Sequence, residues 1–161
     1  MRSRREFLAV AVGAAASQGF AATMVRMRRI GWLTAQRAGS LTTYLEALRQ
    51  GLAEQKIAEG QSVEILYRYG DDELGRVPEM ARDLVAKEVE LLIVQGAAIP
   101  AVLKLDLPVP IVFVTSADPI AAGFAKSLTE PIGNCTGVTF MGFEFVGKRL
   151  ELLREILPRA R

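Results

Sequence analysis

The sequence predicts an α/β fold, an open parallel sheet with flanking helices. From residue 29 onward, short runs of β character alternate with longer runs of helical periodicity, which is typical of parallel strands joined by crossover helices. One short run, residues 91–94, is apolar throughout, as expected for a strand covered on both faces. The chain has 161 residues, half of them hydrophobic, and can therefore bury a core without a disulfide or a metal.

The expected elements follow one another in a regular order. The strands cover residues 30–33, 63–69, 91–94 and 110–114, and the helices between them cover residues 41–56, 77–87 and 100–105. Four leucines place one face of the first helix toward the sheet: Leu41, Leu45, Leu48 and Leu52. We expect Ser40 to cap this helix and Pro78 to lie in the first turn of the second helix.

Four loops of the expected sheet are candidates for binding a ligand. Ligands of open α/β sheets bind at the carboxyl ends of the strands, which here lead into residues 34–39, 70–72, 95–98 and 115–118. These loops are rich in Gly, Ala, Ser, Thr and Asp, so they offer backbone amides and hydroxyls instead of catalytic groups. The loops therefore favour binding over catalysis.

The carboxylates in these loops have two interpretations each. Asp71, Asp72 and Glu73 form either a solvated turn, which is the more common outcome, or a site for a divalent cation. Asp118 precedes Pro119, so it either binds the amine of a ligand or caps a turn.

Composition argues against several classes of function. With no histidine and one cysteine, the chain lacks Ser-His and Cys-His pairs and the usual zinc ligands. The cysteine, Cys135, has apolar neighbours, which favours a buried small side chain over a reactive thiol. No GxGxxG or GxxxxGKS/T phosphate loop is present. From residue 30 onward, 14 basic and 17 acidic residues give a net charge of −3, whereas nucleic-acid binding needs a basic face. We expect no enzyme activity, cofactor or metal.

The first 29 residues predict an export signal followed by a basic linker. A twin-arginine pattern is formed by Ser3, Arg4, Arg5, Phe7 and Leu8. The apolar stretch after it, residues 8–16, is shorter than the roughly 20 residues that span a bilayer. Small residues then precede a cleavage point after Ala21. We expect a signal over residues 1–21, a linker over residues 22–29, and a soluble periplasmic protein. The alternative is a basic amphipathic helix at a cytosolic N-terminus.

Three motifs in the second half of the chain indicate a family. D-P-x-x-x-G begins at Asp118, G-N-C-T-G covers residues 133–137, and K-R-L-E-L-L begins at Lys148. Together with the strand segments and the export signal, they resemble the substrate-binding proteins of ABC transporters of the tryptophan/tyrosine type. This resemblance implies a type I periplasmic-binding-protein fold, in which two α/β lobes joined by a hinge close on a small solute such as an amino acid.

The resemblance also implies a site, partners and domain boundaries. It places the solute-binding residues at the strand ends: Thr34, Ala35, Gly96, Ala97, Ser116, Ala117 and Asp118. The implied partners are ABC permease and ATPase subunits. One lobe would cover residues 30–138, with the hinge and the first helix of a second lobe in residues 139–161. Family members are about twice this long, so we expect a chain truncated to its first half that binds weakly by itself.

Two further expectations concern the helix at residues 148–157 and an alternative function. Leu150, Leu153 and Leu157 form an apolar stripe that is exposed unless the helix docks back or pairs with another chain. The alternative function is a small cytosolic flavodoxin-like or receiver-like regulator or enzyme. A receiver needs a phosphorylatable aspartate after the first strand, whereas Asp71 and Asp72 follow the second one.

Overall fold

The computed structural model describes residues 27–142 and 145–157 of the chain. The export signal expected over residues 1–21 and most of the expected linker lie outside these residues. Within the described part, no helix is both long and apolar enough to cross a membrane.

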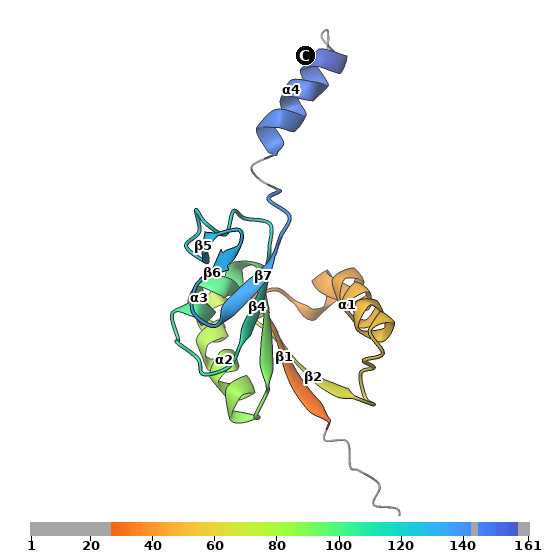
Figure 1. The fold of residues 1–161 in the computed structure, drawn as a ribbon, viewed down its shortest axis with the longest axis vertical. Helices are drawn as coiled ribbons and strands as arrows, with labels where there is room; N and C mark the ends of the chain where they lie inside the picture. The colour runs from red at the N-terminus through yellow and green to blue at the C-terminus, as the bar shows by residue number, and fades with distance from the viewer. Residues whose placement is uncertain (1–26, 143–144, 158–161) are drawn as a thin grey trace, which may run out of the picture.

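A five-stranded parallel sheet forms the centre of the fold, as the sequence predicts (Figure 1). Its strand order is β2-β1-β3-β4-β7, and every neighbouring pair is parallel. The strands are β1 (Arg28–Thr34), β2 (Val63–Tyr69), β3 (Leu91–Gln95), β4 (Ile111–Thr115) and β7 (Cys135–Thr139). A small antiparallel pair, β5 (Ala125–Ser127) and β6 (Glu130–Pro131), lies in the connection from β4 to β7. Strands β5, β6 and β7 were not predicted from the sequence.

The helices cover the sheet from both sides. Helix α1 (Thr42–Glu54) lies on one side, and α2 (Val77–Ala86) and α3 (Ile99–Leu103) lie on the other (Figure 1). Single turns of 3-10 helix precede them: η1 (Ala38–Leu41), η2 (Leu74–Arg76) and η3 (Gly96–Ala98). We call the two sides of the sheet the α1 face and the α2 face. This arrangement is the three-layer α/β/α architecture that right-handed crossovers produce.

The structure differs from the sequence predictions in two places and agrees with them in a third. The prediction that Ser40 caps the first helix is wrong, because Ser40 lies inside η1 and the α1 cap position is Leu41, without a side-chain cap bond. Pro78 does lie in the first turn of α2. Strand β1 begins at Arg28, inside the expected linker, because Arg28 and Arg29 pair with Val63 and Glu64 of β2.

The α2 face of the sheet carries the larger core. Leu33, Leu84 and Leu92 are completely buried there, and the cluster continues across β4 to Cys135 on β7. Gly31 leaves room for Leu92 of β3 and Leu84 of α2, since a Cβ at this position would lie 2.6 Å from Leu92 Cδ2 and 3.1 Å from Leu84 Cδ1. Burial of this continuous surface supplies most of the hydrophobic stabilisation.

The α1 face is covered over part of its width. Trp32, Leu45 and Ile93 are buried beneath α1, as are Leu41, Val63 and Ile65. On β7 the same face is open, because Val138 is 57% exposed, and Phe140 just beyond the strand is 62% exposed. The described part of the chain thus leaves one corner of the α1 face uncovered.

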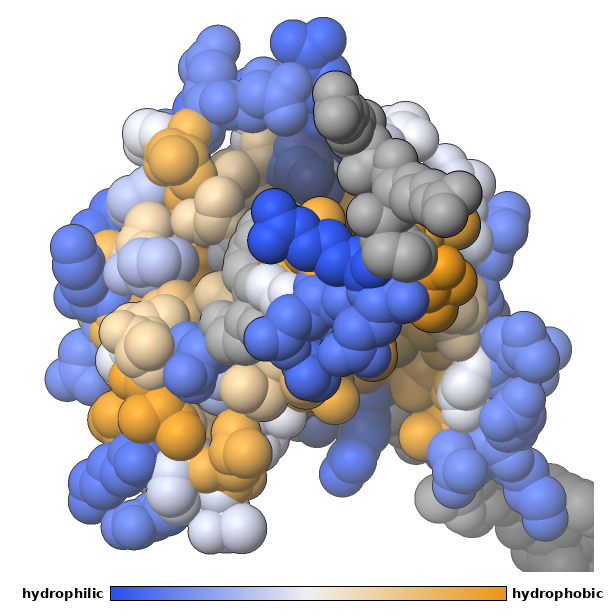
Figure 2. All heavy atoms as spheres, turned by 90° about the horizontal axis from the view of Figure 1, so that it is seen from above, coloured by the Kyte–Doolittle hydropathy of each residue, from blue (hydrophilic) through white to orange (hydrophobic). Residues whose placement is uncertain are grey.

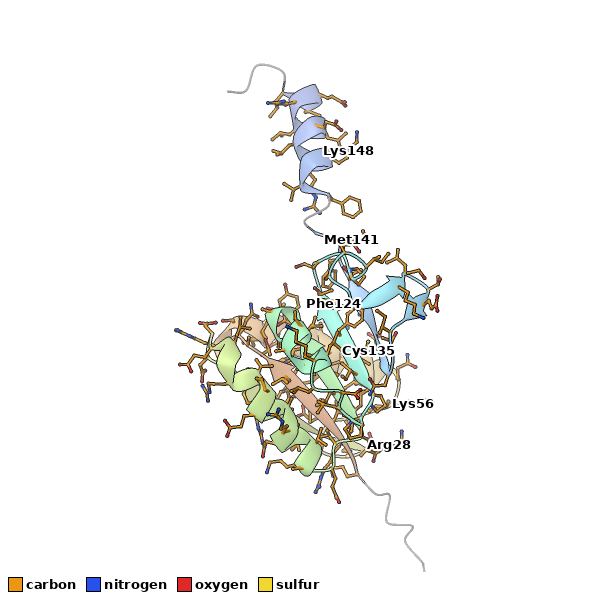
Figure 3. The ribbon with its side chains drawn as sticks, turned by 90° about the vertical axis from the view of Figure 1, so that its left-hand side faces the viewer. Arg28, Lys56, Phe124, Cys135, Met141 and Lys148 are labelled. Carbon is orange, nitrogen blue, oxygen red and sulfur yellow. The ribbon has the colours of Figure 1, made fainter. Side chains whose placement is uncertain are left out.

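The last helix, α4 (Val146–Ile156), stands apart from the sheet. It contains no buried residue, and Figure 3 shows it, with Lys148, beyond Met141. Leu150, Leu153 and Leu157 are each about half exposed, so the expected apolar stripe is on the surface. Figure 2 views the molecule from this end and shows hydrophobic residues exposed among hydrophilic ones. Self-association through this stripe stays a prediction.

Candidate functional site

The carboxyl edge of the sheet has a topological switch point between β1 and β3. The chain leaves β1 toward the α1 face, through η1 and α1, and leaves β3 toward the α2 face, through η3 and α3. Connections that diverge in this way leave a crevice at the strand ends, which is where open α/β sheets bind ligands. The candidate site is therefore built around the ends of β1 and β3.

One row of cross-strand neighbours lies just below this edge. The pairings run from Tyr69 to Thr34, from Thr34 to Gln95, from Gln95 to Val114, and from Val114 to Val138. Side chains alternate along a strand, and Tyr69 and Val114 pack on the α1-side cluster, so this row lies on the α1 face. We call these five residues the switch-point row. It changes from polar and aromatic on β2, β1 and β3 to aliphatic on β4 and β7.

A bond between two polar side chains crosses the switch point. Thr34 Oγ1 donates a hydrogen bond of 2.8 Å to Gln95 Oε1 and accepts one of 3.2 Å from the backbone N–H of Gln36. Thr34 has no exposed surface and Gln95 is half-buried. The bond ties the ends of β1 and β3 together through residues 61 positions apart in the chain.

Threonine hydroxyls shape the loops at three strand ends. In each case the last residue of the strand accepts a hydrogen bond from the backbone N–H two residues later, and the pairs are Thr34 with Gln36, Thr115 with Ala117, and Thr139 with Met141. Such local bonds hold the backbone in a turn at the point where it leaves the sheet. These three hydrogen bonds therefore fix the shape of the loops at the carboxyl edge.

Thr34 and Ala35 lie inward of the edge. They are 0% and 5% exposed, so their side chains are not accessible at the edge. The Ala35 carbonyl accepts the backbone N–H of Asp72 at 2.7 Å, and the Thr34 carbonyl accepts that of Gly70 at 2.9 Å. Gly70 is needed here, because a Cβ on it would lie 2.9 Å from the Ala35 backbone. These residues join the loops after β1 and β2.

Gly96 and Ala97 form the loop after β3. Gly96 is half-buried with φ at +62°, a left-handed conformation that suits glycine, and Ala97 is exposed. The backbone turn at Gly96 sends the chain from β3 into η3 and α3. Of the predicted site residues, these two lie nearest in sequence to Gln95, which the sequence analysis did not single out.

Ser116, Ala117 and Asp118 form the loop after β4. Ser116 is exposed, whereas Ala117 and Asp118 are half-buried. Asp118 Oδ1 accepts the backbone N–H of Ile120 at 2.8 Å, which is the turn-forming arrangement weighed in the sequence analysis. This loop is also joined to the loop after β7, because the Ala117 carbonyl accepts the Thr139 hydroxyl at 2.7 Å.

The structure brings the three predicted site loops side by side. The loop at Thr34 and Ala35 neighbours the loop at Gly96 and Ala97 through the pairing of β1 with β3. The second of these loops neighbours residues 116–118 through the pairing of β3 with β4. Gln95 belongs to the candidate loop 95–98 but was not among the predicted solute-binding residues, although it is a polar residue at the end of an otherwise apolar strand.

The acidic turn after β2 is occupied by arginines. Asp71 forms an ion pair with Arg76, and Asp72 forms one with Arg37, both at 2.7 Å. Among the described residues, no group of three or more His, Cys, Asp or Glu is placed to hold a metal ion. The structure supports the solvated-turn interpretation of this segment.

The G-N-C-T-G motif has structural roles. Asn134 donates hydrogen bonds from Nδ2 to the carbonyls of Leu107 and Val109, at 2.9 and 2.6 Å. Cys135 is 4% exposed and its thiol faces the carbonyls of Ile132 and Phe124; Figure 3 labels Cys135 and Phe124. The motif therefore fastens β7 to the rest of the lobe, and Cys135 is the buried small side chain that the sequence favours.

A group of polar side chains surrounds Tyr67 of β2, one row below the switch-point row. The Tyr67 hydroxyl donates a bond of 2.9 Å to Glu59, and Arg49 lies 5.4 Å from the ring centroid. The rings of Tyr67 and Tyr69 stack with centroids 6.3 Å apart. Burial, and then the bond to Glu59, raise the pKa of Tyr67 to about 12, so this phenol stays protonated at neutral pH.

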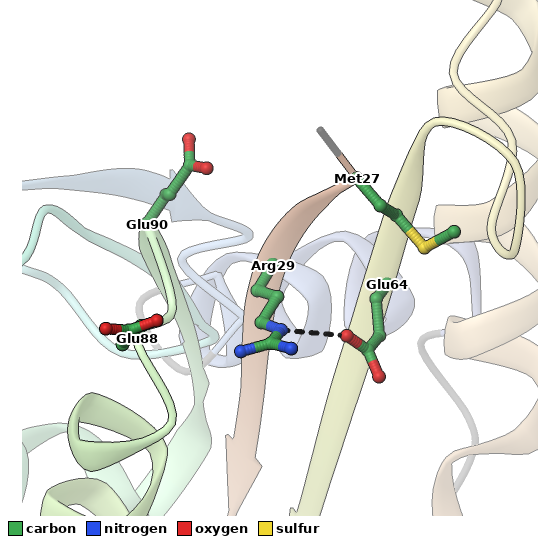
Figure 4. A pocket seen from close by; sticks show the side chains of 5 residues that line it. All are labelled: Met27, Arg29, Glu64, Glu88 and Glu90. Atoms are coloured by element: carbon green, nitrogen blue, oxygen red, sulfur yellow. Dashed lines mark hydrogen bonds and ion pairs between the residues drawn. The ribbon is translucent and has the colours of Figure 1, made fainter. Parts of the chain in front are cut away.

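A hollow at the opposite edge of the sheet does not belong to this site. It has a volume of about 290 Å³ and is lined by Met27, Arg29, Glu64, Glu88 and Glu90 (Figure 4). Arg29 Nε donates to Glu64 Oε2 at 2.9 Å across it. It lies at the amino ends of the strands, away from the switch point, so the topology argues against it as a ligand site.

The fold and its carboxyl edge define an α/β lobe of the substrate-binding kind. The chain belongs to the family of ABC transporter substrate-binding proteins, because the sequence model of that family matches residues 36–161. A curated relative, the tyrosine-binding protein of Clostridioides difficile, is 23% identical over 113 residues, which make up 70% of this chain and 32% of that protein.

Solved structures have the same fold. A ligand-free, open substrate-binding protein with adhesive properties from Clostridium difficile matches with a TM-score of 0.70 and 23% identity, over 84% of this chain and 45% of that one. A conserved domain protein from Vibrio cholerae matches with a TM-score of 0.71 and 24% identity, over 83% of this chain and 45% of that one. An ABC domain in complex with L-Trp from Streptococcus pneumoniae matches with a TM-score of 0.62 and 28% identity, over 70% of this chain and 38% of that one. This chain thus spans less than half the length of each.

Proposed function

We propose that this chain is the solute-binding component of an ABC uptake transporter and binds a small, amino-acid-like solute at the carboxyl edge of its sheet. The observation that carries the proposal is the family membership together with the switch point between β1 and β3. The ligands named for two similar proteins, tyrosine and L-Trp, support an amino-acid-like solute.

The edge offers groups suited to such a solute. The backbone at Gly96 and Ala97 and the exposed Ser116 hydroxyl supply hydrogen-bond donors. The Asp118 carboxylate, already bonded to Ile120, supplies negative charge on the same edge for an ammonium group. We assign Thr34, Ala35 and Ala117 to the frame of the site, where they act through their backbone or through other side chains.

One lobe provides one wall of a two-lobed cleft. We propose that the solute is buried between this wall and a second lobe that begins at α4, with residues 139–145 as the hinge. A solute on one wall stays largely in contact with water, whereas binding sites bury most of the surface of a small ligand. The 161-residue chain alone is therefore expected to bind weakly, with a Kd in the millimolar range, or roughly −4 kcal/mol.

A titration followed by ¹⁵N–¹H NMR tests this proposal on the 161-residue chain. L-tryptophan, L-tyrosine and, as a control, D-glucose are added up to the millimolar range. The amino acids are expected to shift the backbone amide signals of residues 34–36, 95–98 and 115–118, and glucose is not. Unchanged signals at these loops with both amino acids would contradict the proposed solute class. Micromolar binding by the chain alone would contradict the role of a second wall.

We also propose export to the periplasm and coupling to ABC permease and ATPase subunits. The support is the family and the twin-arginine pattern at Ser3, Arg4, Arg5, Phe7 and Leu8. Fractionation of cells that produce the chain tests this part. We expect a periplasmic product shortened by about 21 residues, and retention of the uncut chain in the cytosol when Arg4 and Arg5 are replaced by lysine. A full-length cytosolic wild-type product would instead favour the flavodoxin-like or receiver-like alternative.

A further inference from the structure

We propose that Gln95 binds the solute directly, through its side-chain amide N–H groups, and that the group it recognises is the carboxylate of the solute. Thr34 is then a positioning residue that acts through Gln95. This inference rests on the proposed function and specifies which side chain and which part of the solute meet at the switch point.

The position of Gln95 is the first argument. It is the last residue of β3, it is half-buried, and it pairs with Thr34 of β1 across the switch point. The loop that follows is the one at Gly96 and Ala97, so Gln95 lies between the two strand ends that frame the crevice. The other four residues of β3 are apolar, so a hydrophobic core alone does not account for an amide here.

The hydrogen bonds of Thr34 fix which end of the amide faces outward. Thr34 Oγ1 accepts the Gln36 N–H and donates its own proton to Gln95 Oε1. If the amide were turned round, Thr34 Oγ1 would accept two N–H groups and its proton would lack an acceptor, in a side chain with no exposed surface. A buried donor without an acceptor is destabilising, because it has lost its hydrogen bond to water without replacing it. The carbonyl oxygen therefore faces Thr34 and the NH₂ group faces away from it.

The NH₂ group of Gln95 has unused donor capacity. No acceptor from the described residues bonds to Gln95 Nε2, and the one buried side-chain nitrogen or oxygen without a partner in this part of the chain is Trp32 Nε1. Because Gln95 Nε2 has no partner and is not among the buried atoms, it keeps some solvent-accessible surface. A side chain held at one end and unbonded at the other is preorganised for a ligand.

The charges around the edge favour a carboxylate bound by neutral donors. The arginines near the edge in sequence are already paired: Arg37 with Asp72, Arg68 with Asp83, and Arg76 with Asp71. The amide of Gln95 and the hydroxyl of Ser116 are then suitable side-chain donors. Along the same row, Val114 and Val138 present aliphatic surface, on which the apolar part of an amino acid can lie.

The test compares L-tryptophan with tryptamine, which lacks the carboxylate, by ¹⁵N–¹H NMR on the 161-residue chain. With L-tryptophan, the side-chain NH₂ signals of Gln95 are expected to shift together with the backbone of residues 96–97, and tryptamine is expected to leave the NH₂ signals in place. Q95E keeps an oxygen for Thr34 but replaces the donor with a negative charge. We expect Q95E and Q95A each to weaken L-tryptophan binding by about tenfold or more.

Variants of Thr34 separate positioning from folding. T34V removes the hydroxyl at nearly constant volume and is expected to weaken binding by several-fold, whereas T34S restores the bond and the affinity. Q61E, which makes the same change at an exposed site before β2, is the matched control and should leave binding unchanged.

Three other outcomes would contradict the role of Gln95, recognition of the carboxylate, or the proposed function. Wild-type affinity in Q95E and Q95A overturns the role of Gln95 while the proposed function stands. Equal shifts of the Gln95 signals with tryptamine overturn recognition of the carboxylate. If neither amino acid shifts any loop of the wild-type edge, the proposed function fails, and this inference fails with it.

Discussion

The two faces of the sheet are covered to different extents. On the α2 face the core is continuous from Leu66 on β2 to Cys135 on β7, and Leu33, Leu84 and Leu92 have no exposed surface. On the α1 face burial is complete only beneath α1, and Val138 on β7 is mostly exposed. One face thus holds the lobe together, while the other leaves its corner at β7 accessible.

The β4–β7 connection explains why the α2 face is complete although α3 is short. Helix α3 has only five residues. Phe124 from the β4–β7 connection packs on Phe113, with ring centroids 5.9 Å apart and planes tilted by 58°. An aromatic side chain from a loop therefore covers surface that a longer helix would cover.

The largest expected effect comes from truncating a side chain in the complete core. Leu84→Ala is expected to lower the free energy of unfolding by about 2–5 kcal/mol, because it leaves a cavity between α2 and the sheet. Val138→Ala, on the open corner, should change it by less than about 0.5 kcal/mol. Urea denaturation followed by circular dichroism measures both. Similar losses in the two variants would show that the faces do not differ as described.

Replacing a glycine with alanine should change the free energy of unfolding by less, and the sign of the change should depend on which glycine is replaced. In Gly137→Ala the new Cβ would collide with the Phe113 carbonyl and ring, so we expect a loss of about 1–3 kcal/mol. In Gly51→Ala, inside α1, the new Cβ meets nothing within 4 Å, and we expect a gain of about 0.5–1 kcal/mol. The same denaturation assay separates these signs, and a gain in Gly137→Ala would refute the close packing of β7 on β4.

The smallest expected effect on stability comes from the ion pair of Asp83 with Arg68 at the rim of the α2 face, and it depends on pH. The hydrogen bond from Arg68 Nε, at 2.8 Å, and then the charges of Arg68 and Lys87 hold the pKa of Asp83 below its usual value. A depressed pKa in the folded state stabilises the fold above the unfolded-state pKa, and this contribution disappears as the pH falls through the folded-state pKa.

Asp83→Asn should therefore lower the urea midpoint at pH 7, and the difference from the wild type should shrink as the pH falls toward about 2 and the carboxyl becomes protonated. Both partners are partly exposed, at 29% for Arg68 and 41% for Asp83, so solvent screening keeps the effect small. Glu46→Gln on the exposed side of α1 is the matched control. A midpoint difference that is as large at pH 2 as at pH 7 would argue against the ion pair as its cause.

Local patterns in the sequence were enough to predict most of the sheet. Strand β2 matches the predicted residues 63–69, and β3 and β4 differ from their predicted bounds by one residue. Apolar periodicity predicted α1 and α2, and Pro78 placed the start of α2. These features depend on neighbours along the chain, so the sequence alone is sufficient for them.

Strand β7 was missed because its pattern is weak. It pairs on one side only, and Thr136, Gly137 and Val138 are exposed, so Cys-Thr-Gly-Val-Thr lacks the apolar run of the central strands. The cap at Ser40 was also wrong, because an additional turn, η1, precedes α1. Edge strands and extra turns depend on what the rest of the chain offers for pairing.

By itself, the sequence determined the α/β class and the loops of the carboxyl edge, because each depends on residues close together in the chain. The tertiary structure decided which of the expected site residues are exposed at the carboxyl edge. It buried Thr34 and Ala35, and it placed Gln95 within hydrogen-bond distance of Thr34 across 61 positions of the chain. That contact depends on the register of β1 against β3, and strand register follows from packing the whole sheet on its core.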